Sequence, residues 1–173
     1  MAVQQRRRER RPVDVRAWGV ALAVWCLVFA VPHVAWALGS RAGLGGETAA
    51  ADAALSTGWF ATYNAVTAVL ALAGVVVGLA TALGPAGRHL APRWWPRVLL
   101  GVAVLLVLRG LVGLTGLVID LLGSGITSPP VLVAIEPWFV LGGVACAGLA
   151  RAIRRSRGSI RSKGTTSRSR PRR

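Results

Sequence analysis

Five strongly polar residues lie inside otherwise apolar segments of this chain, and their chemistry suits either ion pairing or the binding of a polar ligand. They are His33, Asn64, Arg109, Asp120 and Glu136. Arg109 lies about halfway along its apolar segment, where a charge is expensive if the segment spans a bilayer and faces lipid. A histidine near a carboxylate could bind a polar group or relay protons. The same residues could instead pair with one another and fix the register of packed helices.

Each polar residue shares a predicted helix face with small residues, because they recur at intervals of three and four. Small residues let membrane helices approach closely. We therefore expect the four stripes to meet and to bring their polar groups together. The stripes are Gly19, Ala23, Cys26, Ala30 and His33; Asn64, Thr67, Ala71, Gly74, Gly78 and Thr81; Arg109, Gly113, Gly116 and Asp120; and Glu136, Val140, Gly143, Ala147 and Ala150.

The depth of each polar residue predicts which of them can pair. At 1.5 Å per residue, His33, Asn64 and Glu136 each lie roughly 7 to 9 Å below the outer end of their segments, and Asp120 is slightly shallower. Arg109 is about 16 Å along the helix from Asp120 by the same rise, so these two cannot touch. Glu136 is closer in depth, and a long arginine side chain can extend outward to meet it. The sequence therefore predicts an Arg109–Glu136 ion pair.

Two classes of function remain open for this polar cluster. In the first, the protein is non-enzymatic, and the cluster either fixes helix packing or forms a small outward-facing site for a ligand or partner. In the second, His33, Glu136 and Arg109 serve a membrane enzyme or a proton-coupled carrier. The chain contains no catalytic motif such as a metalloprotease HExxH or a phosphate-binding loop. The sequence favours the first class and predicts no cofactor and no metal site.

The elements that must position these residues are four long apolar segments. The chain has 173 residues, of which 54% are apolar and 16% charged, a balance too apolar for an ordinary soluble domain. The segments cover residues 17–38, 59–83, 98–122 and 131–150, and a hydrocarbon core of about 30 Å needs about 20 residues. The pattern predicts an all-α, four-helix transmembrane bundle over residues 17–150.

Basic residues are concentrated in the segments that precede and follow this membrane domain in the sequence. Six of the 21 lie in segment 1–16 and ten in segment 151–173. The positive-inside rule then places both termini in the cytoplasm of a cell-membrane protein, and the second connection agrees because it carries Arg88, Arg93 and Arg97. One alternative is a cleavable signal peptide, which the first segment and Ala35-Trp36-Ala37 imitate. Cleavage would leave three spans.

The basic termini also predict partners. The tail 151–173 is rich in Arg, Ser and Gly, so we expect it to be disordered and to attract anionic lipid headgroups. A membrane-protein partner or a homo-oligomer is compatible with the same features. Nucleic acid is disfavoured because no aromatic residues interleave with the basic ones. Cys26 and Cys146 lie in separate spans without metal-ligand spacing and are interpreted as packing residues.

Three short motifs stand out in the apolar segments: residues 32–39 (PHVAWALG), 108–110 (LRG) and 136–143 (EPWFVLGG). At these motifs the chain resembles an uncharacterised bacterial four-span membrane family, domain of unknown function 3995, and the first motif is similar to the family's His-x-x-Trp-Ala-x-Gly signature. The chain departs from the family pattern at Ala35, where an aromatic residue is usual, and at Ser40, where glycine is usual. The resemblance covers residues 17–150. It implies an integral membrane protein and no assigned activity.

Overall fold

The computed structural model describes residues 2–44, 49–84, 92–123 and 130–166. Five helices cover most of this part of the chain, and it contains no strand. They are α1 (Ala2–Ala37), α2 (Ala49–Ser56), α3 (Gly58–Leu83), α5 (Trp95–Gly123) and α6 (Pro130–Thr166). The predicted all-α fold is confirmed.

Four of the helices contain segments long and apolar enough to cross a membrane. These segments are Val15–Ala37, Gly58–Leu83, Trp95–Gly123 and Val133–Arg157. Each has at least 23 residues, and about 20 suffice. They agree with the predicted spans to within a few residues at most ends, and they indicate a multi-pass membrane protein.

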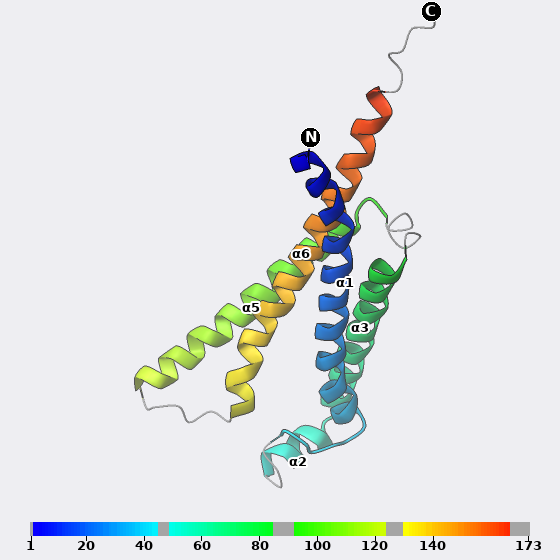
Figure 1. The fold of residues 1–173 in the computed structure, drawn as a ribbon. Helices are drawn as coiled ribbons and strands as arrows, with labels where there is room; N and C mark the ends of the chain where they lie inside the picture. The colour runs from blue at the N-terminus through cyan, green and yellow to red at the C-terminus, as the bar shows by residue number, and fades with distance from the viewer. Residues whose placement is uncertain (1, 45–48, 85–91, 124–129, 167–173) are drawn as a thin grey trace, which may run out of the picture.

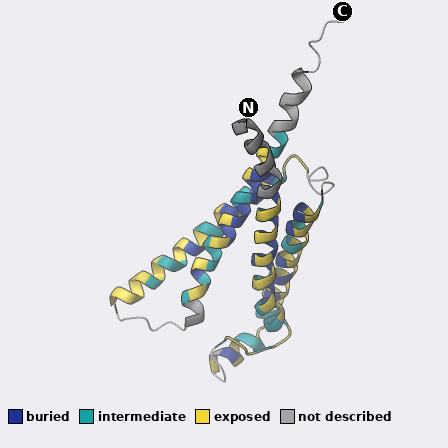
Figure 2. Ribbon diagram, viewed as in Figure 1, coloured by how far each residue is buried: buried dark blue, intermediate teal, exposed yellow. Residues whose placement is uncertain are grey.

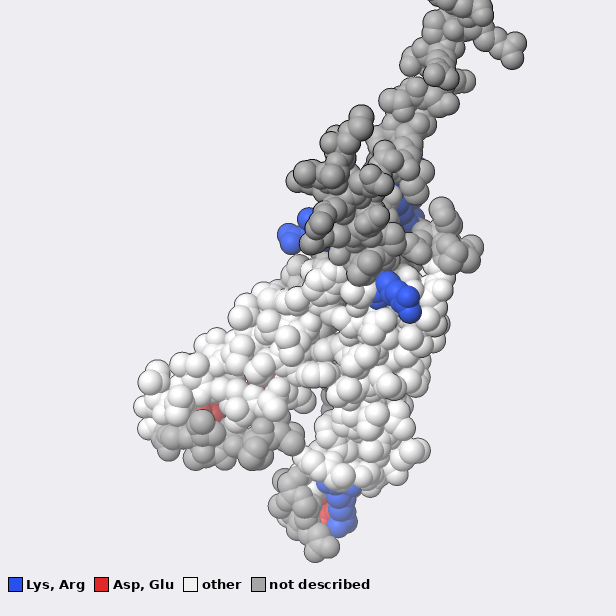
Figure 3. Space-filling model, viewed as in Figure 1, with Lys and Arg blue, Asp and Glu red and all other residues white. Residues whose placement is uncertain are grey.

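The helices form an open bundle made of two helix pairs. One arm consists of α1 and α3 and the other of α5 and α6, and the arms are joined by contacts between α1 and α6. Figure 1 shows the start of α1 and the end of α6 at the closed end of the bundle, from which the arms diverge. We call this the proximal end and the opposite one the distal end. Figure 3 shows basic side chains near the proximal end, a mostly uncharged middle, and a further basic patch with acidic atoms beside it at the distal end.

Glycines decide how closely the two helices of each arm approach. A Cβ on Gly19 would lie 2.7 Å from the carbonyl oxygen of Gly78, and a Cβ on Gly78 would lie 2.6 Å from that of Gly19. In the other arm, a Cβ on Gly143 would lie 2.9 Å from the carbonyl oxygen of Ala103. Since lipid is as apolar as the helix surfaces, this close packing is what favours association.

The two arms are joined by tryptophans that lie over glycines. The indole rings of Trp18 and Trp25 on α1 occupy the space that a Cβ on Gly148 or Gly142 of α6 would need. The Trp25 Nε1–H also donates a 2.8 Å hydrogen bond to the carbonyl oxygen of Trp138. Consequently α1 is the central helix, with its small residues against α3 and its aromatic residues against α6.

The buried core lies toward the proximal end, where the arms meet (Figure 2). Leu149 and Ala150 are completely buried there, and Val15 and Ile153 are almost so. Apolar side chains nearer the distal end are largely exposed in both arms; Leu105, for example, is 68% exposed. For spans in a bilayer, that surface is the one that faces lipid.

Two features of the fold were not predicted from the sequence. First, the connection after α1 contains the short helix α2, whose Asp52 pairs with Arg41 at an Nη2–Oδ1 distance of 2.5 Å. Second, α6 continues to Thr166, although disorder is predicted from Arg151 onward. Extending an existing helix avoids the cost of nucleation, and arginine has a good helix propensity. Residues 167–173 lie outside the described part of the chain, as does Arg88 of the second connection.

Candidate functional site

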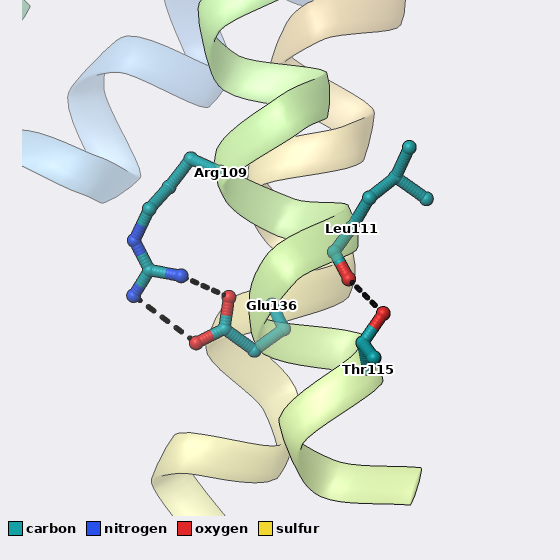
Figure 4. Close-up of polar contacts among 4 residues, drawn as sticks. All are labelled: Arg109, Leu111, Thr115 and Glu136. Carbon is teal, nitrogen blue, oxygen red and sulfur yellow. Dashed lines mark hydrogen bonds and ion pairs between the residues drawn. The ribbon is translucent and has the colours of Figure 1, made fainter.

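Arg109 of α5 and Glu136 of α6 form a two-pronged ion pair. The Arg109 Nη1–H donates to Glu136 Oε2 at 2.6 Å, and the Nη2–H donates to Oε1 at 3.1 Å (Figure 4). This fork-to-fork geometry is the strongest that arginine and a carboxylate can adopt. The predicted Arg109–Glu136 pair is therefore confirmed.

Two glycines of α5 make room for this pair. A Cβ on Gly113 would fall closer than 3.0 Å to all three atoms of the Glu136 carboxyl group, and a Cβ on Gly110 would lie 2.8 Å from the Glu136 carbonyl oxygen. Real Cβ atoms essentially never approach that closely. The Glu136 side chain therefore lies directly against the α5 backbone, within reach of Arg109 one turn away.

His33 of α1 and Asn64 of α3 form a second polar pair in the other arm. The distance from His33 Nδ1 to Asn64 Oδ1 is 2.7 Å, and Asn64 Nδ2–H donates to the carbonyl oxygen of Phe60 at 2.8 Å. Because Asn64 Oδ1 can only accept, His33 Nδ1 is assigned as the protonated ring nitrogen in this arrangement. His33 is 6% exposed and Asn64 1% exposed, so both side chains are removed from lipid and solvent.

The two polar pairs are joined through the rings of Phe29 and Phe139, which we call the aromatic bridge. The Phe29 ring lies 4.6 Å from the His33 ring and 5.6 Å from the Phe139 ring, measured between centroids. The Arg109 guanidinium carbon in turn lies 4.9 Å above the Phe139 ring, within the range of a cation–π contact. A continuous series of contacts thus runs from Asn64 through His33, Phe29 and Phe139 to Arg109.

The polar residues therefore form two pairs, rather than the single cluster that the four stripes predict. The reason is that α3 packs mainly against α1 and α5 mainly against α6, so the stripes meet two by two instead of all four together. Asp120 is exposed on α5, about three turns and 16 Å from Arg109. A Cβ built on Gly116, which lies on the same face, would have no neighbouring atom within 4 Å.

The two side chains of the Arg109–Glu136 pair differ in how far they are exposed. The Arg109 side chain is 51% exposed, whereas that of Glu136 is 10% exposed. Within the described part of the chain, every buried side-chain nitrogen and oxygen has a hydrogen-bond partner. A guanidinium has five N–H groups, and two of those of Arg109 bond to Glu136. A polar ligand would therefore meet Arg109 first.

Neither the aromatic bridge nor the packing of α1 tryptophans on α6 was predicted from the sequence. Trp18, Trp25, Phe29 and Trp36 recur along α1 at spacings of seven, four and seven residues, which places them on one helix face. That spacing was an available signal, but Trp18 and Trp36 also suit the membrane–water interfaces where tryptophan is common. Tertiary structure was needed to show that Trp18 and Trp25 pack on α6.

A cavity of about 430 Å³ lies beside the aromatic bridge, between α1, α3 and α5, with one residue of α6 in its wall. Its walls are almost entirely apolar and include Trp25, Phe29, Cys26 and Cys146. Both cysteines are free thiols. None of the five predicted site residues lines this cavity, so the polar pairs do not converge on it.

The described residues contain no group of three or more His, Cys, Asp and Glu side chains that could hold a metal ion. No family model matches the sequence, and no curated protein or solved structure is significantly similar to it. The resemblance to the four-span family therefore stays a prediction, and function has to be argued from geometry.

Proposed function

We propose that this chain is a non-enzymatic integral protein of the cell membrane, with both termini in the cytoplasm, whose polar pairs fix the packing of its helices. The observation that carries the proposal is that the polar groups satisfy one another. Glu136 receives both hydrogen bonds from Arg109, and Asn64 bonds both to His33 and to its own helix.

Helix packing in a membrane gains particular benefit from such pairs. Sliding either helix by one turn, about 5.4 Å, would separate the partners and leave polar groups in hydrocarbon. Apolar faces and small residues tolerate several registers, because lipid does not force them together. One pair in each arm, joined through Phe29 and Phe139, would specify a single arrangement.

The geometry also bears on the enzyme or carrier alternative. A catalytic or proton-relaying role for His33 and Glu136 requires access to them, yet both residues are buried, His33 with 6% of its whole surface exposed and Glu136 with 10% of its side chain exposed. Arg109 supports a second candidate, the binding of a small polar ligand or partner group from the distal side. It is favoured by the 51% exposure of that side chain and by its remaining N–H donors.

A double-mutant cycle distinguishes the packing role from the ligand role. The variants are Arg109→Gln, Glu136→Gln and the two combined, each purified in detergent and followed by thermal unfolding. If the pair fixes packing, each single variant lowers the melting temperature by leaving one unpaired charge, and the double variant recovers part of the loss. Measured couplings between polar side chains in membrane proteins average about 0.6 kcal/mol and reach about 1.7.

The exposed pair Arg41–Asp52 provides a matched control, because both of its side chains are more than half exposed. Neutralising either one should change stability by less than about 1 kcal/mol. If Arg109→Gln and Glu136→Gln were also that mild, with no coupling, the packing role would be excluded. A fluorescent-protein fusion to each terminus, one at a time, tests the proposed cytoplasmic placement of both.

A further inference from the structure

A recess of about 400 Å³ lies on the surface of the α1–α6 junction, at the proximal end. Trp18 of α1 forms one side, and α6 contributes Val144, Ala147, Gly148 and Ala152 together with Arg151 and Arg155. The recess is thus far from the polar pairs, which lie toward the distal end. Its lining changes along α6 from apolar at Val144 to cationic at Arg155.

The shape of the recess depends on Gly148. The Trp18 ring occupies the position that a Cβ on Gly148 would need, so the indole lies directly on the α6 backbone. A ring held in this way is a rigid apolar wall. Tryptophan is also frequent at the level of lipid headgroups, where its apolar body and polar N–H suit both environments.

Arg151 and Arg155 carry two positive charges one turn apart on one helix face. Both are exposed, and no ion pair is formed by either within the described part of the chain. Like charges at this spacing repel and destabilise a helix. Arg41 and Arg109, by contrast, each have a carboxylate partner. An anion placed between Arg151 and Arg155 would remove the repulsion.

The depth of the two arginines matches the edge of a bilayer. The fourth apolar segment begins at Val133, so Arg151 lies 18 residues and Arg155 22 residues along the helix. At 1.5 Å per residue these distances are about 27 and 33 Å, on either side of a hydrocarbon thickness of about 30 Å. Val144 and Ala147 then lie within the hydrocarbon.

We infer that this recess binds one anionic phospholipid, with its phosphate between Arg151 and Arg155 and an acyl chain along Val144 and Ala147 against Trp18. Arginine recognises phosphate through paired N–H groups. The apolar part of the lining continues into the membrane, which favours a lipid over a free phosphate ion. This inference is independent of the proposed role of the polar pairs, and it assigns a specific site where the basic composition alone predicts only diffuse attraction.

The test is native mass spectrometry of the full chain titrated with phosphatidylglycerol, and separately with phosphatidylcholine. The variant Arg151→Gln/Arg155→Gln is compared with Arg154→Gln/Arg97→Gln, which removes the same charge from exposed positions that do not line the recess. Because each recess arginine would bond the phosphate directly, losing both should weaken phosphatidylglycerol binding roughly a hundredfold, about tenfold for each charge-assisted contact. The control removes no direct contact and should weaken binding at least about tenfold less, and phosphatidylcholine should bind weakly to all forms.

A second variant, Ala147→Phe, fills the recess without changing any charge. It should also reduce phosphatidylglycerol binding while leaving the melting temperature of the lipid-free protein nearly unchanged, because Ala147 is only partly buried. Equal losses in the two double arginine variants would show diffuse surface attraction and overturn the site. So would unaltered binding in Ala147→Phe, equal affinity for phosphatidylcholine, or full competition by inorganic phosphate.

Discussion

Replacing Gly113 by alanine tests whether the Arg109–Glu136 pair stabilises the fold. The new methyl group would lie closer than 3.0 Å to all three carboxyl atoms of Glu136, so the carboxyl group must move. The Arg109 hydrogen bonds, at 2.6 and 3.1 Å, cannot both keep their length after that movement. Gly116 provides the matched control, since it lies three residues further along the same helix and a Cβ there meets nothing within 4 Å.

The magnitude follows from three contributions. Loss of a polar contact in a membrane protein costs between about 0.6 and 1.7 kcal/mol, and overpacking adds about 1 to 3 kcal/mol. Alanine in place of glycine within a helix stabilises the folded protein by about 1 kcal/mol. The net destabilisation of Gly113→Ala is therefore between about 0.6 and 3.7 kcal/mol. Gly116→Ala should be neutral or stabilising by up to about 1 kcal/mol.

The assay is thermal unfolding of the purified protein in detergent, followed by tryptophan fluorescence or by loss of the monodisperse peak on size-exclusion chromatography. A change of 1 kcal/mol shifts the melting temperature of a chain of this size by about 2 to 4 °C, so a loss of about 2 kcal/mol would lower it by about 4 to 8 °C. Shortening the carboxylate with Glu136→Asp in the Gly113→Ala background should recover part of the loss. Equal melting temperatures for Gly113→Ala and Gly116→Ala would refute the reasoning.

Three further outcomes are expected from the contacts between helices. Gly78→Val should destabilise the protein by about 1 to 3 kcal/mol, because the larger side chain forces α1 and α3 apart. The yield of a cysteine cross-link between these two helices should fall accordingly. Trp25→Phe should cost about 1 kcal/mol in thermal unfolding through the lost hydrogen bond to α6; an unchanged melting temperature would argue against that contact. Asn64→Leu removes the partner of His33 and should lower the melting temperature more than Thr62→Val, because the Thr62 hydroxyl bonds only to its own helix. A larger loss in Thr62→Val would contradict the His33–Asn64 pair.

The membrane-spanning elements could be predicted from the sequence because hydropathy and length are local properties. The Arg109–Glu136 pair could also be predicted, because the depth of each residue along a regular helix follows from its position. The continuation of α6 past Arg151 to Thr166 could not, because the composition of the tail is typical of disorder and does not show how far the preceding helix extends into it. The short helix α2 carried no comparable signal.

The sequence by itself determined that the chain has four spans, which face of each span is small and polar, and which charge could reach Glu136. Only the tertiary structure decided that His33 pairs with Asn64 and that these two lie in a different arm from Arg109 and Glu136. The physical reason is that a stripe of small residues shows which side of a helix can pack closely, but it fits any other such stripe equally well. Helix partners were decided by specific shapes: Trp18 and Trp25 lie over the glycines of α6, so α1 and α6 join the arms while α3 packs mainly on α1 and α5 mainly on α6.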